Sequence, residues 1–291
     1  MHGALYIMRD AAHTVPRFPP SGLEEARRGQ FQTIKHLWAL DAPMLKVDKG
    51  IMILGAGGEL VSLPSPSFLI EHAEHGLLIF DTGLAGAGDP ASTYGPLAEL
   101  FMIDFPAERA LDRQLESLGF STADVERVVI SHLHFDHTGG LEHFAGAQGY
   151  IGSGELRYAR TPDNHVTGFF RQEDLDAADR IDWCEVPAGY DHDVFGDGSV
   201  VVLSLPGHTP GSLGLKLRLP DGSTLVLSGD VAHIQDNISC CVGMPADSDT
   251  VSAIESLKKL KLLRSQPNTT VVVNHDIDDW NRLRANGRQV V

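Results

Sequence analysis

The segment Ser131-His132-Leu133-His134-Phe135-Asp136-His137 places three imidazoles and a carboxylate within six residues. It directly follows Val125–Ile130, an apolar run that predicts a strand ending in a polar loop. So many ionisable groups are costly to bury unpaired, and neutral imidazole and carboxylate are the ligands that zinc-like ions accept. In a turning loop, positions 132 and 134 would point one way, and 136 and 137 would point toward a second place. The stretch therefore predicts a metal site that could serve two ions.

Three further ligand-type residues stand at the ends of predicted strands. His208 follows the run Val200–Leu205, Asp230 follows Thr224–Ser228, and His275 follows Thr270–Val273. A single histidine at a strand end is more often structural than metal-binding. Together with the first cluster, however, the three residues strengthen the metal hypothesis, because rigid strand ends can hold ligands accurately.

These motifs, with the earlier Phe80-Asp81-Thr82-Gly83, resemble the metallo-β-lactamase superfamily from about Ile51 to Trp280. The resemblance implies an α/β (α+β) fold of the αββα sandwich type, in which two mixed β-sheets are flanked by helices and hold metals at their edge. We expect this domain over residues 46–291, after an N-terminal extension over 1–45.

The resemblance also implies a ligand set for two divalent ions. His132, His134 and His208 would hold one ion, Asp136, His137 and His275 the other, and Asp230 would bridge them. Asp81 would orient the cluster from behind, or else cap local amides in a turn. Zinc is the expected metal, although manganese, iron and cobalt accept the same ligands.

The stretch Ser228-Gly229-Asp230-Val231-Ala232-His233-Ile234-Gln235-Asp236-Asn237 is similar to the N-acyl-homoserine lactone lactonases, whose pattern is G-D-A-x-Y followed by Asn. His233 stands in place of that tyrosine and either replaces it as a hydrogen-bond donor or points elsewhere. The resemblance implies a lactone-opening hydrolase in which a metal-bridging hydroxide attacks the carbonyl. Asp136 would protonate the leaving alkoxide and His233 would stabilise the oxyanion.

Other reactions of the same ligand set stay open. These are hydrolysis of an aromatic lactone such as pyridoxolactone, glyoxalase II-like thioester hydrolysis and phosphotriester hydrolysis. Antibiotic hydrolysis is disfavoured, because the superfamily's true β-lactamases usually lack a bridging carboxylate like Asp230. A non-catalytic binding or redox module is disfavoured too, because seven ligands for two metals leave coordination positions open.

The formal net charge of −16 disfavours nucleic acid and anionic membrane surfaces as partners. The resemblance implies a small-molecule lactone as the partner. No membrane-spanning run and no secretory leader is visible, so we expect a cytoplasmic protein. Cys184, Cys240 and Cys241 are expected to be reduced thiols. A homodimer, common among related lactonases, stays open.

The remaining pattern predicts most of the sheet and helix elements. A helix is expected over Leu23–Leu40 as an ordinary surface helix or, with Met44, as a lid over the site. Further strands are expected at Gly50–Leu54, Glu59–Leu63, Ser67–Glu71, Leu77–Phe80 and Gly214–Leu219, and helices at Glu108–Leu118, Thr250–Leu263 and Asp276–Ala285. Six apolar residues could form an acyl-chain groove or ordinary core: Met44, Phe101, Met102, Phe105, Phe169 and Phe170.

Overall fold

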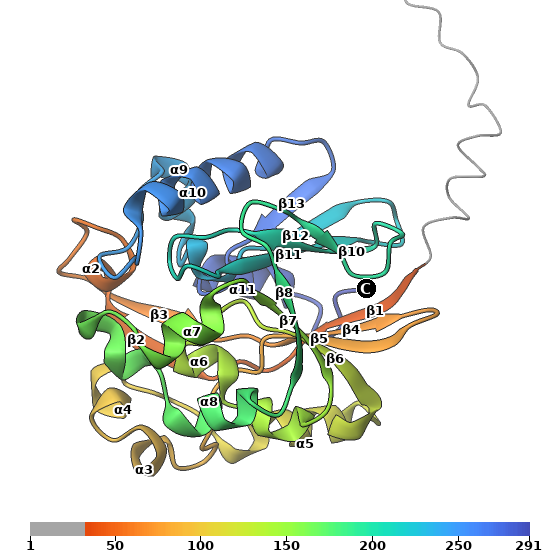
Figure 1. Ribbon diagram of the computed structural model, residues 1–291, viewed down its shortest axis with the longest axis horizontal. Helices are drawn as coiled ribbons and strands as arrows, with labels where there is room; N and C mark the ends of the chain where they lie inside the picture. Colours follow the sequence, from red (N-terminus) through yellow and green to blue (C-terminus); the bar gives the residue numbers. More distant parts are fainter. Residues whose placement is uncertain (1–32) are drawn as a thin grey trace, which may run out of the picture.

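Two β-sheets form the centre of the protein, whose computed structural model describes residues 33–291 (Figure 1). The six-stranded sheet has the order β1 (Ile34–Ala39), β4 (Phe68–His72), β5 (Gly76–Phe80), β6 (Val125–Val129), β7 (Gln148–Gly152), β8 (Asp182–Val186). The five-stranded sheet has the order β13 (Thr269–Val272), β12 (Thr224–Leu227), β11 (Leu213–Arg218), β10 (Val200–Ser204), β9 (His192–Asp193). A separate hairpin consists of β2 (Met44–Asp48) and β3 (Leu60–Pro64).

Helices cover the outer faces of both sheets (Figure 1). The six-stranded sheet packs against α5 (Leu111–Ser117) and α8 (Gln172–Ala178), and the five-stranded sheet against α10 (Thr250–Arg264). The shorter helices are α2 (Lys49–Met52), α3 (Pro90–Tyr94), α4 (Pro96–Leu100), α6 (Phe135–Thr138), α7 (Glu155–Arg160), α9 (Gln235–Cys240) and α11 (Ile277–Leu283). This arrangement confirms the predicted αββα sandwich.

Alternating side chains explain why the central strands need both layers. On β5, Leu78 and Phe80 face the core between the sheets, whereas Leu77 and Ile79 face the helices. On β10 the alternate positions divide in the same way between the inner core and α10. Because successive residues of a strand point to opposite faces, a nearly continuous apolar run is buried on both sides.

Strand direction brings the polar strand ends to one edge. β5, β6 and β7 are mutually parallel. β11 is antiparallel to both β10 and β12, and β12 is parallel to β13. The carboxyl ends of β10, β12 and β13 therefore point the same way, and the loops that follow them carry the predicted ligands.

Two predicted elements are wrong. The helix expected over Leu23–Leu40 is a strand, β1, from Ile34 to Ala39, paired antiparallel with β4 in the six-stranded sheet. Residues 23–32 of that helix lie outside the described residues, and so does most of the suggested lid. The strand expected at Gly50–Leu54 is instead the helix α2, which Asp48 caps by accepting a hydrogen bond from the Gly50 amide at 2.7 Å.

The other predicted strands and helices are confirmed to within a few residues at their ends. The three cysteines are free thiols, as expected. Among the residues from 33 onward, no helix is both long and apolar enough to cross a membrane.

Candidate metal centre

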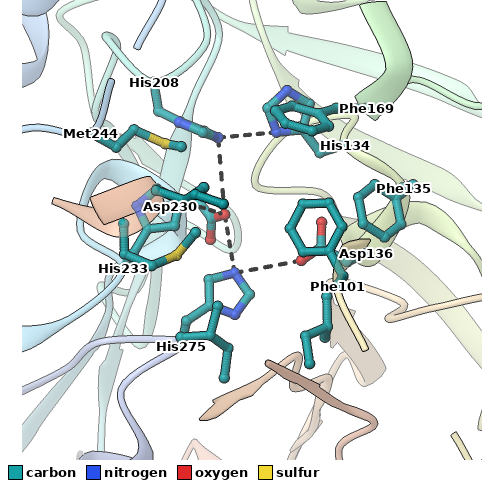
Figure 2. A pocket seen from close by; sticks show the side chains of 14 residues that line it. Phe101, His134, Phe135, Asp136, Phe169, His208, Asp230, His233, Met244 and His275 are labelled. Atoms are coloured by element: carbon teal, nitrogen blue, oxygen red, sulfur yellow. Dashed lines mark hydrogen bonds and ion pairs between the residues drawn. The ribbon is translucent and has the colours of Figure 1, made fainter. Parts of the chain in front are cut away.

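The loops after β6, β10, β12 and β13 place all seven predicted ligands in one cluster at the edge of the two sheets. Figure 2 shows His134, Asp136, His208, Asp230 and His275 converging from both sides of a pocket. The six residues other than Asp136 are each at most 5% exposed, and the Asp136 side chain is 12% exposed at the pocket.

His132, His134 and His208 form the first group. The His208 Nε2 atom lies 3.2 Å from His132 Nε2 and 3.1 Å from His134 Nδ1. The α6 turn, which begins after His134, lets the next two ligands diverge from this group.

Asp136, His137 and His275 form the second group. The Asp136 Oδ2 atom lies 3.6 Å from the Nε2 atoms of both His137 and His275. The ligand atoms of each group all lie within 4.8 Å of one another. The structure thus separates the early motif into two halves, each completed by a histidine from the other sheet.

Asp230 lies between the two groups. Its Oδ2 atom is within 3.0–3.9 Å of a ring nitrogen from each of five histidines: His132, His137, His208, His233 and His275. His275 Nε2 forms a hydrogen bond with it at 3.0 Å, whereas His137 Nε2 lies 3.2 Å away without hydrogen-bond geometry. One carboxylate therefore contacts both groups.

The outward ring nitrogens of three histidines have hydrogen-bond partners that orient the imidazoles, and that of His208 faces a carboxylate without a hydrogen bond. His137 Nδ1 pairs with Asp81 Oδ2 at 2.8 Å, and His275 Nδ1 with the Pro64 carbonyl at 2.6 Å. His132 Nδ1 lies 3.1 Å from the Ser131 hydroxyl, and His208 Nδ1 lies 3.5 Å from the Asp247 carboxylate. Such outer partners are what hold a metal-binding imidazole in its productive orientation.

Several inward-facing atoms fit a bound cation. His137 Nε2 and Asp230 Oδ1 are buried without a hydrogen-bond partner. In the first group three ring nitrogens face one another, and neutral imidazole offers a lone pair rather than a proton at the nitrogen that binds metal. Buried polar atoms without partners are costly, so this donor set suits divalent ions bound between the residues.

Burial and neighbouring charges set the protonation of the cluster. Burial, followed by repulsion from the other imidazoles, lowers the pKa of both His132 and His134 well below the usual value. Burial also opposes a charged His137, but three carboxylates, Asp230 first among them, outweigh it and hold that pKa well above the usual value. Without a metal, the neutral form of His132 and His134 is therefore favoured, whereas the charged form of His137 is favoured by its carboxylate neighbours.

The backbone before Asp230 allows no side chain. Gly229 has a φ of +57°, and a Cβ atom on it would lie 2.2 Å from the Leu213 carbonyl oxygen. Only glycine tolerates this combination of a left-handed conformation and a close backbone contact. The backbone at Gly229, directly before Asp230, thus packs closely against the start of β11.

Asp81 lies behind the second group. It accepts hydrogen bonds from the Ser131 amide at 2.7 Å and the Ser131 hydroxyl at 2.9 Å, in addition to its contact with His137. Its φ of +56° is one that aspartate tolerates better than most residues. Asp81 therefore joins the end of β5 to the start of the His132 loop.

A pocket with mainly apolar walls opens above the cluster. Phe101 and Phe169 line it as candidate groove residues, whereas Phe105 is buried in the core and Met102 is 51% exposed. Neither Met44 nor Phe170 is among the lining residues. Apolar lining residues that sequence reasoning missed are Leu45, Ile51, Met52, Leu63, Phe135 and Met244.

One pocket wall contacts a site histidine directly. The His134 ring makes edge contacts with Phe169 and Phe170, at centroid distances of 5.4 and 4.8 Å. Figure 2 shows Phe169 beside His134 on the side of the pocket opposite Met244.

His233 points into the site. It is 5% exposed, its Nε2 atom lies 3.2 Å from Asp230 Oδ2, and its ring stacks on His275 at 5.6 Å. The Asn237 side chain accepts hydrogen bonds from the amides of His233 and Ile234, which fixes the loop. The His233 side chain therefore lines the pocket and does not point elsewhere.

The contacts made by Pro64 and Asp247 were missed from the sequence. A backbone carbonyl such as that of Pro64 has no residue-type signal at all. Asp247 lies in Pro245-Ala246-Asp247-Ser248-Asp249, where a turn carboxylate is unremarkable. Its proximity to His208 depends on the chain folding back, since the Ser248 amide donates to the His208 carbonyl.

Comparison with known proteins agrees with this geometry. The sequence model of the Metallo-beta-lactamase superfamily matches residues 61–275. The N-acyl homoserine lactonase AttM of Agrobacterium fabrum is 33% identical over 221 residues, which cover 75% of this chain and 84% of that protein. An N-acyl homoserine lactonase of Bacillus cereus is 26% identical over 254 residues, covering 84% and 95% of the two chains.

Solved structures show the same fold. An N-acyl homoserine lactone hydrolase with N-hexanoyl-L-homoserine at its catalytic metal center superposes with a TM-score of 0.73 at 23% identity, covering 86% of this chain and 96% of that one. AidC, described as a dizinc quorum-quenching lactonase, gives a TM-score of 0.63 at 17% identity over 84% and 91%. Because the sequence model covers most of the chain and AttM exceeds 30% identity over three quarters of it, the chain belongs to the metallo-β-lactamase superfamily.

Proposed function

We propose that the protein is a dinuclear metal-dependent hydrolase that opens the ring of N-acyl-homoserine lactones. The observation that carries this proposal is the convergence of five imidazole nitrogens on Asp230 Oδ2 at the base of an apolar pocket. Curated relatives named N-acyl homoserine lactonases support the choice of substrate.

The two groups of residues would each hold one divalent ion, with zinc as the expected metal. His132, His134 and His208 would hold the first ion; Asp136, His137 and His275 would hold the second. Asp230 would be shared by both. Bound ions of this kind lower the pKa of water toward 7, which would make a bridging hydroxide available to attack the lactone carbonyl.

His233 and Asp136 are proposed to act on the substrate itself. The His233 ring lines the pocket beside Asp230, where an Nε2–H could donate a hydrogen bond to the carbonyl oxygen as negative charge develops on it. Asp136 also lines the pocket and could hold the proton that the leaving ring oxygen takes up when the acyl C–O bond breaks.

The pocket walls suit a neutral substrate with an apolar tail. Apart from the clustered histidines and aspartates, every residue that lines the pocket is apolar. An acyl chain would be desolvated against Phe101, Phe169 and Met52, at roughly 25 cal/mol per Å² of buried apolar surface. A charged thioester conjugate such as one of glutathione would find no lining lysine or arginine.

A hydrolysis panel tests the proposal. It would contain hexanoyl- and decanoyl-homoserine lactones, a pyridoxolactone, a glutathione thioester and a phosphotriester, with metal content measured on the same preparation. We expect about two ions per chain and the highest kcat/KM on an acyl-homoserine lactone. Faster turnover of the thioester, phosphotriester or aromatic lactone would replace the proposed substrate. Full lactonase activity in metal-free protein would overturn the metal-dependent mechanism.

A further inference from the structure

Glu155 is a fully buried carboxylate outside the ligand set. It is the first residue of α7 and is 0% exposed. A buried carboxylate is expensive unless hydrogen bonds compensate it, so the contacts of this side chain call for an explanation.

The two carboxylate oxygens of Glu155 bind two different loops. Oε1 accepts a hydrogen bond from the Leu133 amide at 3.0 Å, and Oε2 accepts one from the Gly211 amide at 3.0 Å. Burial raises the pKa of Glu155, and the neighbouring Thr209 side chain, whose hydroxyl lies 2.8 Å from Ser212 Oγ, partly offsets this. Leu133 lies between His132 and His134, and Thr209 directly follows His208.

These two loops come from different sheets. The Leu133 loop follows β6 of the six-stranded sheet, and the Gly211 loop follows β10 of the five-stranded sheet. The approach is tight, because a Cβ atom on Gly211 would lie 2.6 Å from the Glu155 Cβ. Glu155 therefore links the sheets directly beside the first group, while no contact joins it to Asp136, His137 or His275 among the described hydrogen bonds.

We propose that Glu155 is a positioning residue that sets the spacing of His132, His134 and His208 and thereby the metal affinity of the first position. This inference rests on the proposed function, since it assumes that the first group holds an ion. A carboxylate suits the role because both of its oxygens accept, matching one amide donor in each loop. Glutamine has a single acceptor oxygen and would turn its NH₂ group toward one of the two donors.

The test is a zinc titration of the metal-free protein by calorimetry, with zinc per chain measured after dialysis. In Glu155→Gln we expect one of the two zinc ions to bind about 10- to 100-fold more weakly, the usual cost of losing an outer partner of a metal ligand. The other ion should bind as in the unaltered protein. Lactonase activity should fall and recover with excess zinc, which loss of folded protein would not allow.

A double variant identifies which position is affected. His134→Ala disables the first position, so adding Glu155→Gln to it should weaken the remaining zinc ion no further. Gln114→Glu is the matched control, because Gln114 is also buried and also joins separate segments, donating to the carbonyls of Asp41 and Arg109. That variant should lower the melting temperature and leave zinc affinity unchanged.

If Glu155→Gln does not fold, Thr209→Val is the second test, since it removes the polar neighbour of the Glu155 carboxylate and should weaken binding of the same ion by a few fold. The role of Glu155 would be overturned if Glu155→Gln and Thr209→Val, wherever they fold, bind two zinc ions with unchanged affinity. The proposed function would then still stand. An unaltered protein that binds no zinc would instead overturn the proposed function, and this inference with it.

Discussion

Two clusters with a buried histidine beside an aspartate lie at opposite ends of β5, and only one has the features of a metal site. At the amino end, the buried His72 pairs through Nε2 with Asp197 at 3.3 Å, and its Nδ1 accepts from the Glu74 and His75 amides. At the carboxyl end, ring nitrogens face one another or Asp230, and some have no partner. Burial of histidine is common to both clusters. The distinguishing feature is convergence of acceptor atoms, some of which no group among residues 33–291 satisfies.

The largest expected effect is at Asp230. Asp230→Asn removes the charge that both groups contact, so we expect loss of at least one metal ion per chain. The fall in kcat/KM should exceed about 100-fold, since even outer partners of metal ligands cost 10- to 100-fold. Metal analysis and lactone hydrolysis on one preparation measure both.

Asp182→Asn is the control for that change, because Asp182 is an exposed carboxylate on β8. It should leave metal content and rate as they are. Asp230→Asn protein that keeps two ions and normal turnover would show that the carboxyl-end cluster, like the one at His72, is structural.

A smaller effect is expected at His233, which is in the site cluster but outside the two ligand groups. His233→Ala should lower kcat about 100-fold, the usual loss for one donor to a developing oxyanion. His233→Tyr restores a donor and should recover much of that loss. Metal content should stay near that of the unaltered protein in both variants. Equal rates in all three proteins would remove His233 from the mechanism, and loss of metal would make it a ligand.

The smallest effect on activity is expected at His72. His72→Gln should keep metal content and turnover within about twofold and cost about 1 kcal/mol of stability from its buried hydrogen bonds. Burial lowers the pKa of His72, against the attraction of Asp197. The unfolded chain, with a pKa of about 6.5, therefore takes up this proton first as the pH falls, so stability drops below that pH.

Urea unfolding of the two metal-free proteins at pH 7.5 and 5.5 checks this prediction. The stability gap between the unaltered protein and His72→Gln should narrow at pH 5.5, because the variant lacks the acid-sensitive group. A gap that widens in acid would mean that folding raises the pKa of His72, and impaired turnover would mean that the two clusters are coupled.

The candidate ligand residues that the structure brings together could be picked out from the sequence, because each lies in a local motif after an apolar strand. The error at β1 has a structural origin. A β-bulge between Ile34 and His36 shifts the register, so that Ile34 and Leu37 face the same core at a spacing of three residues. That spacing imitates a helix, and burial of both strand faces hides the alternation that would reveal a strand.

The contacts that support the ligands could not be predicted from the sequence. Glu155 is 22 residues from Leu133 and 56 from Gly211, and neither partner offers more than a backbone amide. The Pro64 carbonyl meets His275 across 211 residues. Local patterns show which residues are chemically able to bind a metal, whereas only the packing of two sheets shows what holds them in place.

The contact of Phe169 and Phe170 with His134 has a consequence for altering substrate range. Of the two, Phe169 also lines the pocket, so substituting it would change both the groove and the packing of a proposed ligand. A change in the accepted acyl-chain length would then come with a change in metal occupancy. Ile51 and Met52 line the same pocket from α2, a helix that carries no site histidine. Evolution or engineering could therefore change substrate preference through α2 while leaving the hydrolytic centre intact.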